Sequence, residues 1–307
     1  MIDGKVMTFI SVTETGSFTA AAKALSLTQP AVSHHISQLE EMLGVTLFSR
    51  EKGRVVLTKQ GETVLRYARR FEAIYQGMKD DLWDMEHNIE RLRIGITHTA
   101  ESNIVAQVLA AYGEEHPGVK ITIITDSIKN LYTMLENYEL DLTIVESTPN
   151  NRALNSLLLD TDYLVCAMAN ENPLAKRAMV TISDLMKEKM ILRLPKSGTV
   201  NLFVDKLRAM GKSIGDFDVI LEVDNIATIK DLVRLNMGVS ILPQSTCLDE
   251  VRKGKMTVLP VENMSMARET NIVYQQDFPH MTVLQEILAL YKKQSSLIDQ
   301  RYSKYLK

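Results

Sequence analysis

Cysteine is scarce in this sequence of 307 residues, which contains only Cys166 and Cys247 and has no CxxC spacing. Both lie in apolar stretches, a context that favours buried thiols in a reducing compartment over a disulfide framework or a metal site. A redox switch is the alternative, but no basic residue adjoins either cysteine in the sequence to lower the pKa of its thiol.

Long apolar runs are also missing. No stretch is long enough to span a bilayer, and the N-terminus has no basic region followed by an apolar block. We therefore expect a cytoplasmic protein without a secretion signal and without a membrane partner.

Common catalytic signatures are absent: GxSxG, GxGxxG and HExxH do not occur. Gly211-Lys-Ser213 resembles the end of a phosphate-binding loop, but Lys206 stands where the first glycine of that loop belongs. His34 and His35 point about 100° apart on a helix and cannot bind one ion together. The other histidines have no ligand spacing: His87, His98, His116 and His280. We expect neither an enzyme, nor a metal site, nor a cofactor.

The charge is unevenly distributed. The net charge is −3, which argues against a wholly basic nucleic-acid-binding protein, but residues 1–70 carry nine lysines and arginines against six acids. This part is therefore +3 and the remainder −6. A modestly basic N-terminal module on an acidic body is compatible with DNA binding.

The first 60 residues predict three helices and a hairpin. The first helix stops at Gly16, and Ser17 can cap the alanine-rich helix FTAAAKAL. Thr28 can cap a third helix that ends at Gly44. Residues 51–54 then read as the tight turn of a small β-hairpin, or wing.

A long helix is predicted next, from about residue 58 to residue 88. Its apolar residues recur at spacings of 4 and 3 over more than three heptads. Packing of this seam on the chain itself is possible, but we favour pairing with the same helix of a second subunit. The seam consists of Val64, Ala68, Phe71, Tyr75, Met78, Leu82, Met85 and Ile89.

From Leu92 onwards, short β-branched strands alternate with helices. The strands LRIGIT, VKITIIT, LDLTIVE, DYLVCAMA, MILRL, FDVILEV, GVSILP, MTVLPV and ETNIVYQQ indicate a mostly parallel α/β body. A further strand appears late in this region, which suggests two lobes, with the chain crossing from one to the other and returning.

The third helix has one buried stripe and one open face. Val32, Ile36 and Leu39 face inward, whereas Gln29, Pro30, Ser33, His34, Ser37 and Gln38 face outward. Short polar side chains allow a helix to approach the major groove, where glutamine can pair with adenine and a histidine donor can reach guanine. A small helical protein-interaction domain with a polar surface is the alternative.

The run GSFTAAAKALSLTQPAVSHHISQLEEMLGVTLFSR, followed by GRVVLTKQGE, resembles the winged helix-turn-helix of LysR-type transcriptional regulators. The resemblance extends over the whole chain, because a heptad helix and a two-lobed α/β domain follow. It implies an α/β protein with a winged helix-turn-helix at 1–58, a linker and dimerisation helix at 59–90 and an effector-binding domain at 91–307. The last would resemble type 2 periplasmic binding proteins, with lobe I at about 91–161 and 267–307 and lobe II at about 162–266.

The resemblance also implies partners. These are double-stranded DNA with a dyad-symmetric operator, a small-molecule co-inducer, further copies of the chain in a dimer or tetramer, and RNA polymerase. By position, base and groove contacts fall on Gln29, Pro30, Ser33 and His34, with Ser26 and Thr28 near the DNA backbone. Arg50, Lys52 and Arg54 would serve the wing, and Lys59 would contact a phosphate. Many family members carry Arg or Lys where His34, Ser37 and Gln38 stand here, so we expect a shallower salt dependence of DNA binding.

The effector is expected where strands end and helices begin, between the two lobes. The candidate residues are Thr97, His98, Thr99, Ser127, Glu146, Ser197, Gly198, Thr199 and Asn225. Hydroxyls and N–H groups at helix starts suit a carboxylate or another oxyanion, although simple N-capping is the alternative role of such residues. Glu146 can pair with an amine or repel a dianion, and Arg193 can compensate its charge if it points inward.

Overall fold

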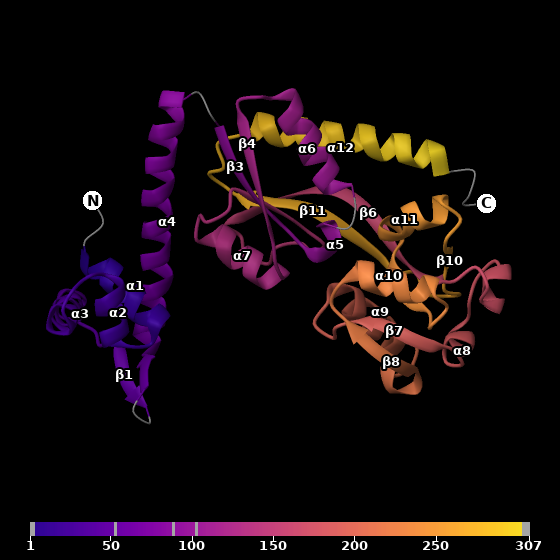
Figure 1. The fold of residues 1–307 in the computed structure, drawn as a ribbon, viewed down its shortest axis with the longest axis horizontal. Helices are drawn as coiled ribbons and strands as arrows, with labels where there is room; N and C mark the ends of the chain where they lie inside the picture. The colour runs from indigo at the N-terminus through magenta and orange to yellow at the C-terminus, as the bar shows by residue number, and fades with distance from the viewer. Residues whose placement is uncertain (1–3, 52–53, 88–89, 102–103, 303–307) are drawn as a thin grey trace. The chain divides into compact units, whose positions relative to one another are not determined.

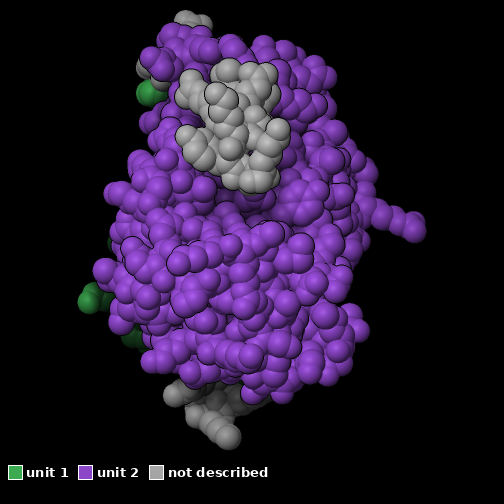
Figure 2. Space-filling view, turned by 90° about the vertical axis from the view of Figure 1, so that its right-hand side faces the viewer, with its two compact units in different colours: residues 1–92, 132–141 green, residues 93–131, 142–307 purple. Residues whose placement is uncertain are grey.

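The computed structural model describes residues 4–51, 54–87, 90–101 and 104–302 (Figure 1). The chain divides into two compact units, which are coloured separately in Figure 2. One consists of residues 1–92 and 132–141, and the other of residues 93–131 and 142–307.

The N-terminal unit begins with the expected three helices and hairpin. They are α1 (Gly4–Thr15), α2 (Phe18–Ala24), α3 (Gln29–Leu43), β1 (Phe48–Glu51) and β2 (Arg54–Leu57). The caps are those read from the sequence. The Ser17 hydroxyl accepts from the Ala20 N–H and the Thr28 hydroxyl from the Ala31 N–H, each at 3.3 Å. Gly44 ends α3 in the left-handed conformation with φ 68°.

A single apolar core holds this part together. Phe9 of α1, Ala21 of α2, Val32 and Ile36 of α3 and Leu47 before β1 are all buried in it. The apolar stripe of α3 therefore packs inward, which leaves the opposite side of α3 exposed.

The linker helix α4 (Lys59–His87) has two parts that differ in burial. Near its start, Ala68 is buried and Val64 is half-buried against the N-terminal core. Farther along, Phe71, Met78 and Leu82 are 63%, 47% and 58% exposed. The predicted seam is thus covered by the N-terminal core at its start and exposed at Phe71, Met78 and Leu82, with Tyr75 half-buried between them.

The rest of the chain forms the α/β domain, with nine strands in the described residues. They are β3 (Glu90–Ile96), β4 (Val119–Thr125), β5 (Leu142–Val145), β6 (Leu154–Met168), β7 (Lys189–Arg193), β8 (Asp218–Val223), β9 (Ser240–Pro243), β10 (Thr257–Leu259) and β11 (Ala267–Gln275). The helices are α5 (His98–Glu101), α6 (Val105–Glu115), α7 (Ile128–Glu136), α8 (Ile182–Leu185), α9 (Gly198–Ala209), α10 (Ile226–Arg234), α11 (Gln244–Arg252) and α12 (Met281–Tyr302), with 3-10 turns at Pro173–Lys176 and Ile214–Asp216.

The long strand β6 connects the two lobes. Its first half pairs with β11, which is also paired with β5, in the order β6-β11-β5-β3-β4. Its second half pairs with β9 and β10, and β7 and β8 pair beside β9 through a bridge from Met190 to Val239. Helices α6 and α12 lie side by side along the sheet of the first lobe (Figure 1).

The expectation of a mostly parallel body is wrong. β3 with β5 and β7 with β8 are parallel, but β6 and β11 run antiparallel to each other, and β5, β9 and β10 run antiparallel to the strands they meet there. The reason is that the chain crosses between lobes on β6 and returns on β11, so both lobes contain strands of opposite direction.

Candidate functional site

The exposed side of α3 is the first candidate site. Gln29, Pro30, His34 and Ser37 are exposed and Ser33 is half-buried. Gln29 donates a hydrogen bond from Nε2 to the Ser33 hydroxyl at 3.0 Å, which aligns both side chains on one face. An open hollow of about 720 Å³ adjoins this face and is lined also by residues 16–19 and by Phe48 and Ser49 of β1.

The two adjacent histidines separate as expected. His34 is exposed, whereas the Nδ1 atom of His35 lies 2.9 Å from the Thr8 hydroxyl of α1. The same hydroxyl donates to the Gly4 carbonyl at 2.8 Å. Because a hydroxyl has a single hydrogen to donate, His35 must be the donor in the contact with Thr8. His35 therefore fastens α3 to α1.

The other residues predicted to contact DNA are either exposed or lie outside the described part of the chain. Thr28 is exposed and caps α3, Ser26 is exposed in the turn before it with φ 56°, and Lys59 is exposed at the start of α4. Lys52 and the side chains of Arg50 and Arg54 lie outside the described residues. Ser26, Thr28 and Lys59 are thus accessible, as is the polar face of α3, and their contacts with DNA stay predictions.

The second candidate site surrounds a buried arginine that the sequence did not single out. Arg268, the second residue of β11, has a side chain only 8% exposed. Its Nη2 atom lies 3.7 Å from Oε1 of Glu146 and 4.0 Å from Oδ2 of Asp162, and Nη1 donates to the Thr199 hydroxyl at 3.3 Å. One guanidinium thus contacts the end of β5, the crossing strand β6 and the start of α9.

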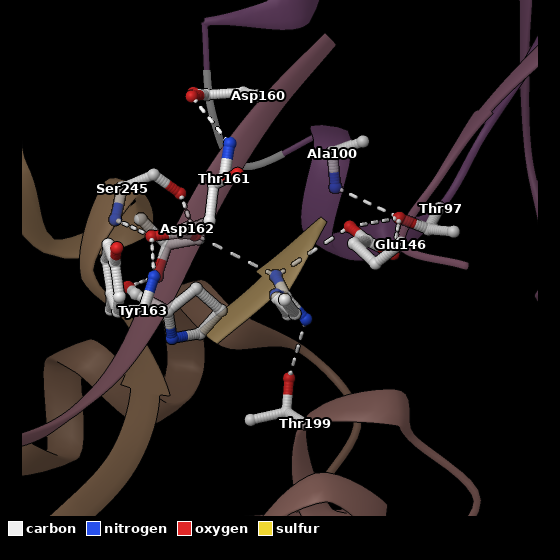
Figure 3. A network of polar contacts seen from close by, with 12 residues as sticks. Thr97, Ala100, Glu146, Asp160, Thr161, Asp162, Tyr163, Thr199 and Ser245 are labelled. Carbon is white, nitrogen blue, oxygen red and sulfur yellow. Dashed lines mark hydrogen bonds and ion pairs between the residues drawn. The ribbon is translucent and has the colours of Figure 1, made fainter. Parts of the chain in front are cut away.

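The acids around Arg268 are anchored differently (Figure 3). Glu146 accepts the Thr97 hydroxyl at 2.8 Å, and Thr97 in turn accepts the Ala100 N–H at 3.1 Å. Asp162 accepts the backbone N–H and the hydroxyl of Ser245, at the start of α11, at 3.2 and 2.7 Å. Figure 3 shows Thr97 and Glu146 on one side of this network, and Asp162 with Ser245 on the other.

The arginine that neutralises Glu146 is not the expected one. Arg193, at the end of β7, is buried, but it donates from Nη2 to Asp224 at 3.0 Å. Alternation along β7 puts Arg193 on the same face as Ile191, which packs into the core with residues of α10 and α11. Arg268 supplies the compensating charge instead.

Of the predicted effector residues, Glu146 and Thr199 contact Arg268, and Thr97 joins them through its hydrogen bond to Glu146. Ser127, Ser197 and Asn225 cap α7, α9 and α10, and each accepts a backbone N–H three residues on. Among the described contacts these three caps do not join the Arg268 network. Thr99 is buried, His98 is exposed in α5, and Gly198 opens α9 beside Thr199.

An open cavity of about 370 Å³ lies after the end of β5, along the first half of β11 and beside the middle of β6. Glu146 and Arg268 line it, together with Glu269, Thr161 and Asn271. Pockets that take small molecules have volumes of about 300 to 1,000 Å³, so this one is at the small end of that range.

The cysteines are remote from any reactive arrangement. Both are fully buried and free. Burial is the main cause that raises the pKa of Cys247 to about 12, against a lowering influence from the Thr246 hydroxyl and Lys230. Burial likewise raises the pKa of Cys166. Lys230 is a basic neighbour that the sequence did not reveal, yet both thiols stay protonated at neutral pH.

The described residues offer neither a metal site nor a membrane-spanning helix. No group of three or more His, Cys, Asp or Glu residues there is arranged to hold a metal ion. No helix in the described part of the chain is long and apolar enough to cross a membrane.

Comparison with known protein families finds two matches. Residues 5–62 match the family described as "Bacterial regulatory helix-turn-helix protein, lysR family", and residues 86–296 match "LysR substrate binding domain". The second match alone spans more than half of the chain.

Among curated relatives, the chain is similar to the HTH-type transcriptional activator CmpR of Synechocystis sp. The two are 26% identical over 299 residues, which is 97% of this chain and 92% of CmpR. It is also 28% identical to the regulator CfxR of Cupriavidus necator, over 87% of this chain and 83% of CfxR.

Solved structures show the same fold. CbnR, a LysR family transcriptional regulator, has a TM-score of 0.68 at 17% identity, covering 95% of this chain and 99% of that one, and it has also been solved with its target DNA. The regulatory domain of Synechocystis CcmR in complex with 2-PG has a TM-score of 0.59 at 24% identity, over 66% of this chain and 97% of that domain. With a DNA-binding helix-turn-helix, a linker helix and a two-lobed effector-binding domain, the chain belongs to the LysR family of transcriptional regulators controlled by small molecules.

Proposed function

We propose that α3 reads the major groove of an operator through Gln29, Pro30, Ser33 and His34. The observation that carries this is the exposed polar face of α3 opposite its buried stripe of Val32, Ile36 and Leu39. Side chains this short allow the helix to approach base edges closely. Ser26, Thr28, Lys59 and the wing residues Arg50, Lys52 and Arg54 would contact the DNA backbone.

Two such domains are brought together, in this proposal, by the open seam of α4. Its exposed apolar residues lie on one helix face, and a second copy of the same helix offers a matching seam. A pair of reading helices related by two-fold symmetry fits a dyad-symmetric operator. Assembly into a dimer or tetramer and contact with RNA polymerase belong to the same proposal.

The effector would bind beside Arg268, where residues of both lobes meet. Glu146 from the first lobe and Thr199 from the second contact the same guanidinium, and Thr97 donates a hydrogen bond to Glu146. A carboxylate or another oxyanion would find donors on Arg268 and at the start of α9. A ligand that contacts both lobes changes their equilibrium, and through α4 the geometry of the paired reading helices.

DNase footprinting with the purified full-length protein tests this function. A chain lacking residues 1–60 should lose the footprint on its operator, and a saturating effector should alter the footprint or the bend of the DNA. Retention of the footprint by the shortened chain would contradict the reading role of α3. We also propose that the chain catalyses no reaction and acts in the cytoplasm, in line with relatives that are named as transcriptional regulators.

A further inference from the structure

The charges around Arg268 are unbalanced. Glu146 and Asp162 have side chains only 6% and 11% exposed, and the single guanidinium of Arg268 lies between them. Buried carboxylates are costly unless each is paired or hydrogen-bonded. The two acids differ in how far this condition is met.

Asp162 is well satisfied. It accepts the N–H and the hydroxyl of Ser245 and also the N–H of Tyr163, which is 2.8 Å from Oδ1. Asp162 belongs to β6, but its carboxylate lies against the first turn of α11, where the positive end of the helix dipole is favourable. This carboxylate is therefore stable without any ligand.

Glu146 is poorly satisfied. A carboxylate offers about four acceptor positions, yet among the described residues the only hydrogen bond to Glu146 comes from the Thr97 hydroxyl. That one hydrogen is shared between Oε1 and Oε2, each 2.8 Å from the hydroxyl oxygen. Arg268 Nη2, at 3.7 Å from Oε1, is beyond hydrogen-bonding distance. Glu146 therefore has acceptor positions left for a cationic donor.

Arg268 also has N–H groups that make no hydrogen bond within the described part of the chain. A guanidinium has five N–H groups, and within the described part of the chain only Nη1 makes a hydrogen bond, to Thr199 at 3.3 Å. Its Nε is buried and has no partner there. Nη2 and the second N–H of Nη1 remain able to donate a pair of hydrogen bonds to a carboxylate.

Glu146 and Arg268 are both among the residues that line the 370 Å³ cavity. Two buried carboxylates, those of Glu146 and Asp162, stand against the one guanidinium of Arg268, which gives this site a net negative charge. A dianion would add to this negative charge, and a simple monoanion would leave Glu146 with the Thr97 hydroxyl as its one hydrogen-bond donor among the described residues. A ligand that brings one ammonium and one carboxylate supplies what each buried group lacks.

We propose that the effector of this chain is a small zwitterion of the α-amino-acid type. Its carboxylate binds Arg268, and its ammonium binds Glu146. Because Nη2 and Oε1 are 3.7 Å apart, the two groups of the ligand must lie on the same or neighbouring carbons. This inference rests on the proposed effector site and specifies the class of ligand that it takes.

The test is a thermal-shift screen of the full-length protein with the twenty common amino acids, followed by calorimetry on each compound that binds. Every such compound is compared with its α-hydroxy acid, which lacks the ammonium, and with its decarboxylated amine. We expect at least one amino acid to bind and each analogue to bind about 100-fold more weakly, since a site built for a polar group rejects ligands that lack it. This comparison needs no variant and is independent of any folding defect.

Two variants test whether Glu146 is the group that recognises the ammonium of the ligand. Glu146→Gln should lose most of the preference for the amino acid over its hydroxy acid. Glu269→Gln, which removes an exposed carboxylate that follows Arg268 in the sequence but lies on the opposite face of β11, should keep most of it.

The outcomes separate the two proposals. If no amino acid binds while sulfate or 2-PG does, the effector site stands and the zwitterion is wrong. Equal binding of an amino acid and its hydroxy acid also overturns the zwitterion. If neither amino acids nor oxyanions bind, and neither changes the DNA footprint, the effector site beside Arg268 is itself wrong.

Discussion

At the scale of single residues, neighbouring histidines perform different tasks because a helix turns by about 100° per residue. His35 points back toward α1 and contacts Thr8, a residue only 1% exposed. His34 points to solvent from the exposed face of α3. Identical side chains, one position apart, thus face the neighbouring helix and solvent, and the contact of His34 with DNA stays a prediction.

Alanine substitutions separate these tasks. His35→Ala removes the donor to the Thr8 hydroxyl and should lower the free energy of unfolding by about 1 to 2 kcal/mol. His34→Ala should leave unfolding unchanged but weaken binding to the operator more than binding to a scrambled duplex. Urea unfolding and fluorescence anisotropy on both duplexes measure the two effects. Equal losses on both duplexes for His34→Ala would remove His34 from base reading.

Asp126, after β4, gives a pH-dependent prediction. The N–H of Ser127, 2.6 Å from Oδ1, is the main cause that lowers the pKa of this carboxyl, and the Asn130 amide adds to it. A lowered pKa in the folded state contributes stability above the usual value of 3.8, and this stability is lost as the pH falls through the folded-state pKa. Asp126→Asn should therefore melt below the wild type at pH 7, and the gap should close toward pH 3. A gap that stays constant across this range would exclude the charge as its cause.

At the scale of elements, the sequence was most informative where the signal was local. Caps at Ser17 and Thr28, the stop at Gly44 and the seam of α4 were all readable from neighbouring residues. The first half of β6 was missed, because its outward polar residues interrupt the apolar pattern by which strands were recognised. The four-residue helix α8 was missed, since a single turn leaves no periodicity to detect.

Gly61 in the first turn of α4 illustrates an element held by close packing. A Cβ atom there would lie 2.2 Å from the backbone carbonyl oxygen of Leu47, which cannot move aside as a flexible side chain can. Gly61→Ala should therefore destabilise the N-terminal unit by about 1 to 3 kcal/mol. Chemical denaturation followed by circular dichroism measures this.

Gly77 is the matched control on the same helix. Nothing lies within 4 Å of a Cβ atom at this position. Gly77→Ala should be neutral or stabilise the helix by up to about 1 kcal/mol, because alanine has the higher helix propensity. If both substitutions had the same sign and size, the contact with Leu47 would not be what requires glycine at position 61.

At the scale of the whole molecule, the effector site depends on pairings far apart in the sequence. Arg268 lies opposite Asp162 in the register of β11 with β6, over 100 residues away along the chain. Thr97, Glu146 and Thr199 could be predicted because each follows a strand or begins a helix. Arg268 and Asp162 could not, because they lie within strands whose partners only the fold reveals. This difference explains why the sequence led to Arg193 as the compensating cation.

The open seam of α4 carries the last prediction. Phe71 and Leu82 are 63% and 58% exposed in the single chain, so a charge at either position costs this fold little. In a pair of helices the same charge would be buried without a partner, which is strongly unfavourable. Leu82→Glu should therefore convert the dimer to a monomer and weaken operator binding, because two half-sites are no longer held together. Gln76→Lys, at an exposed position on the same helix outside the seam, is the control and should leave both properties unchanged. Light scattering and footprinting of the two variants decide the matter: a dimeric Leu82→Glu with normal DNA affinity would place the subunit interface elsewhere.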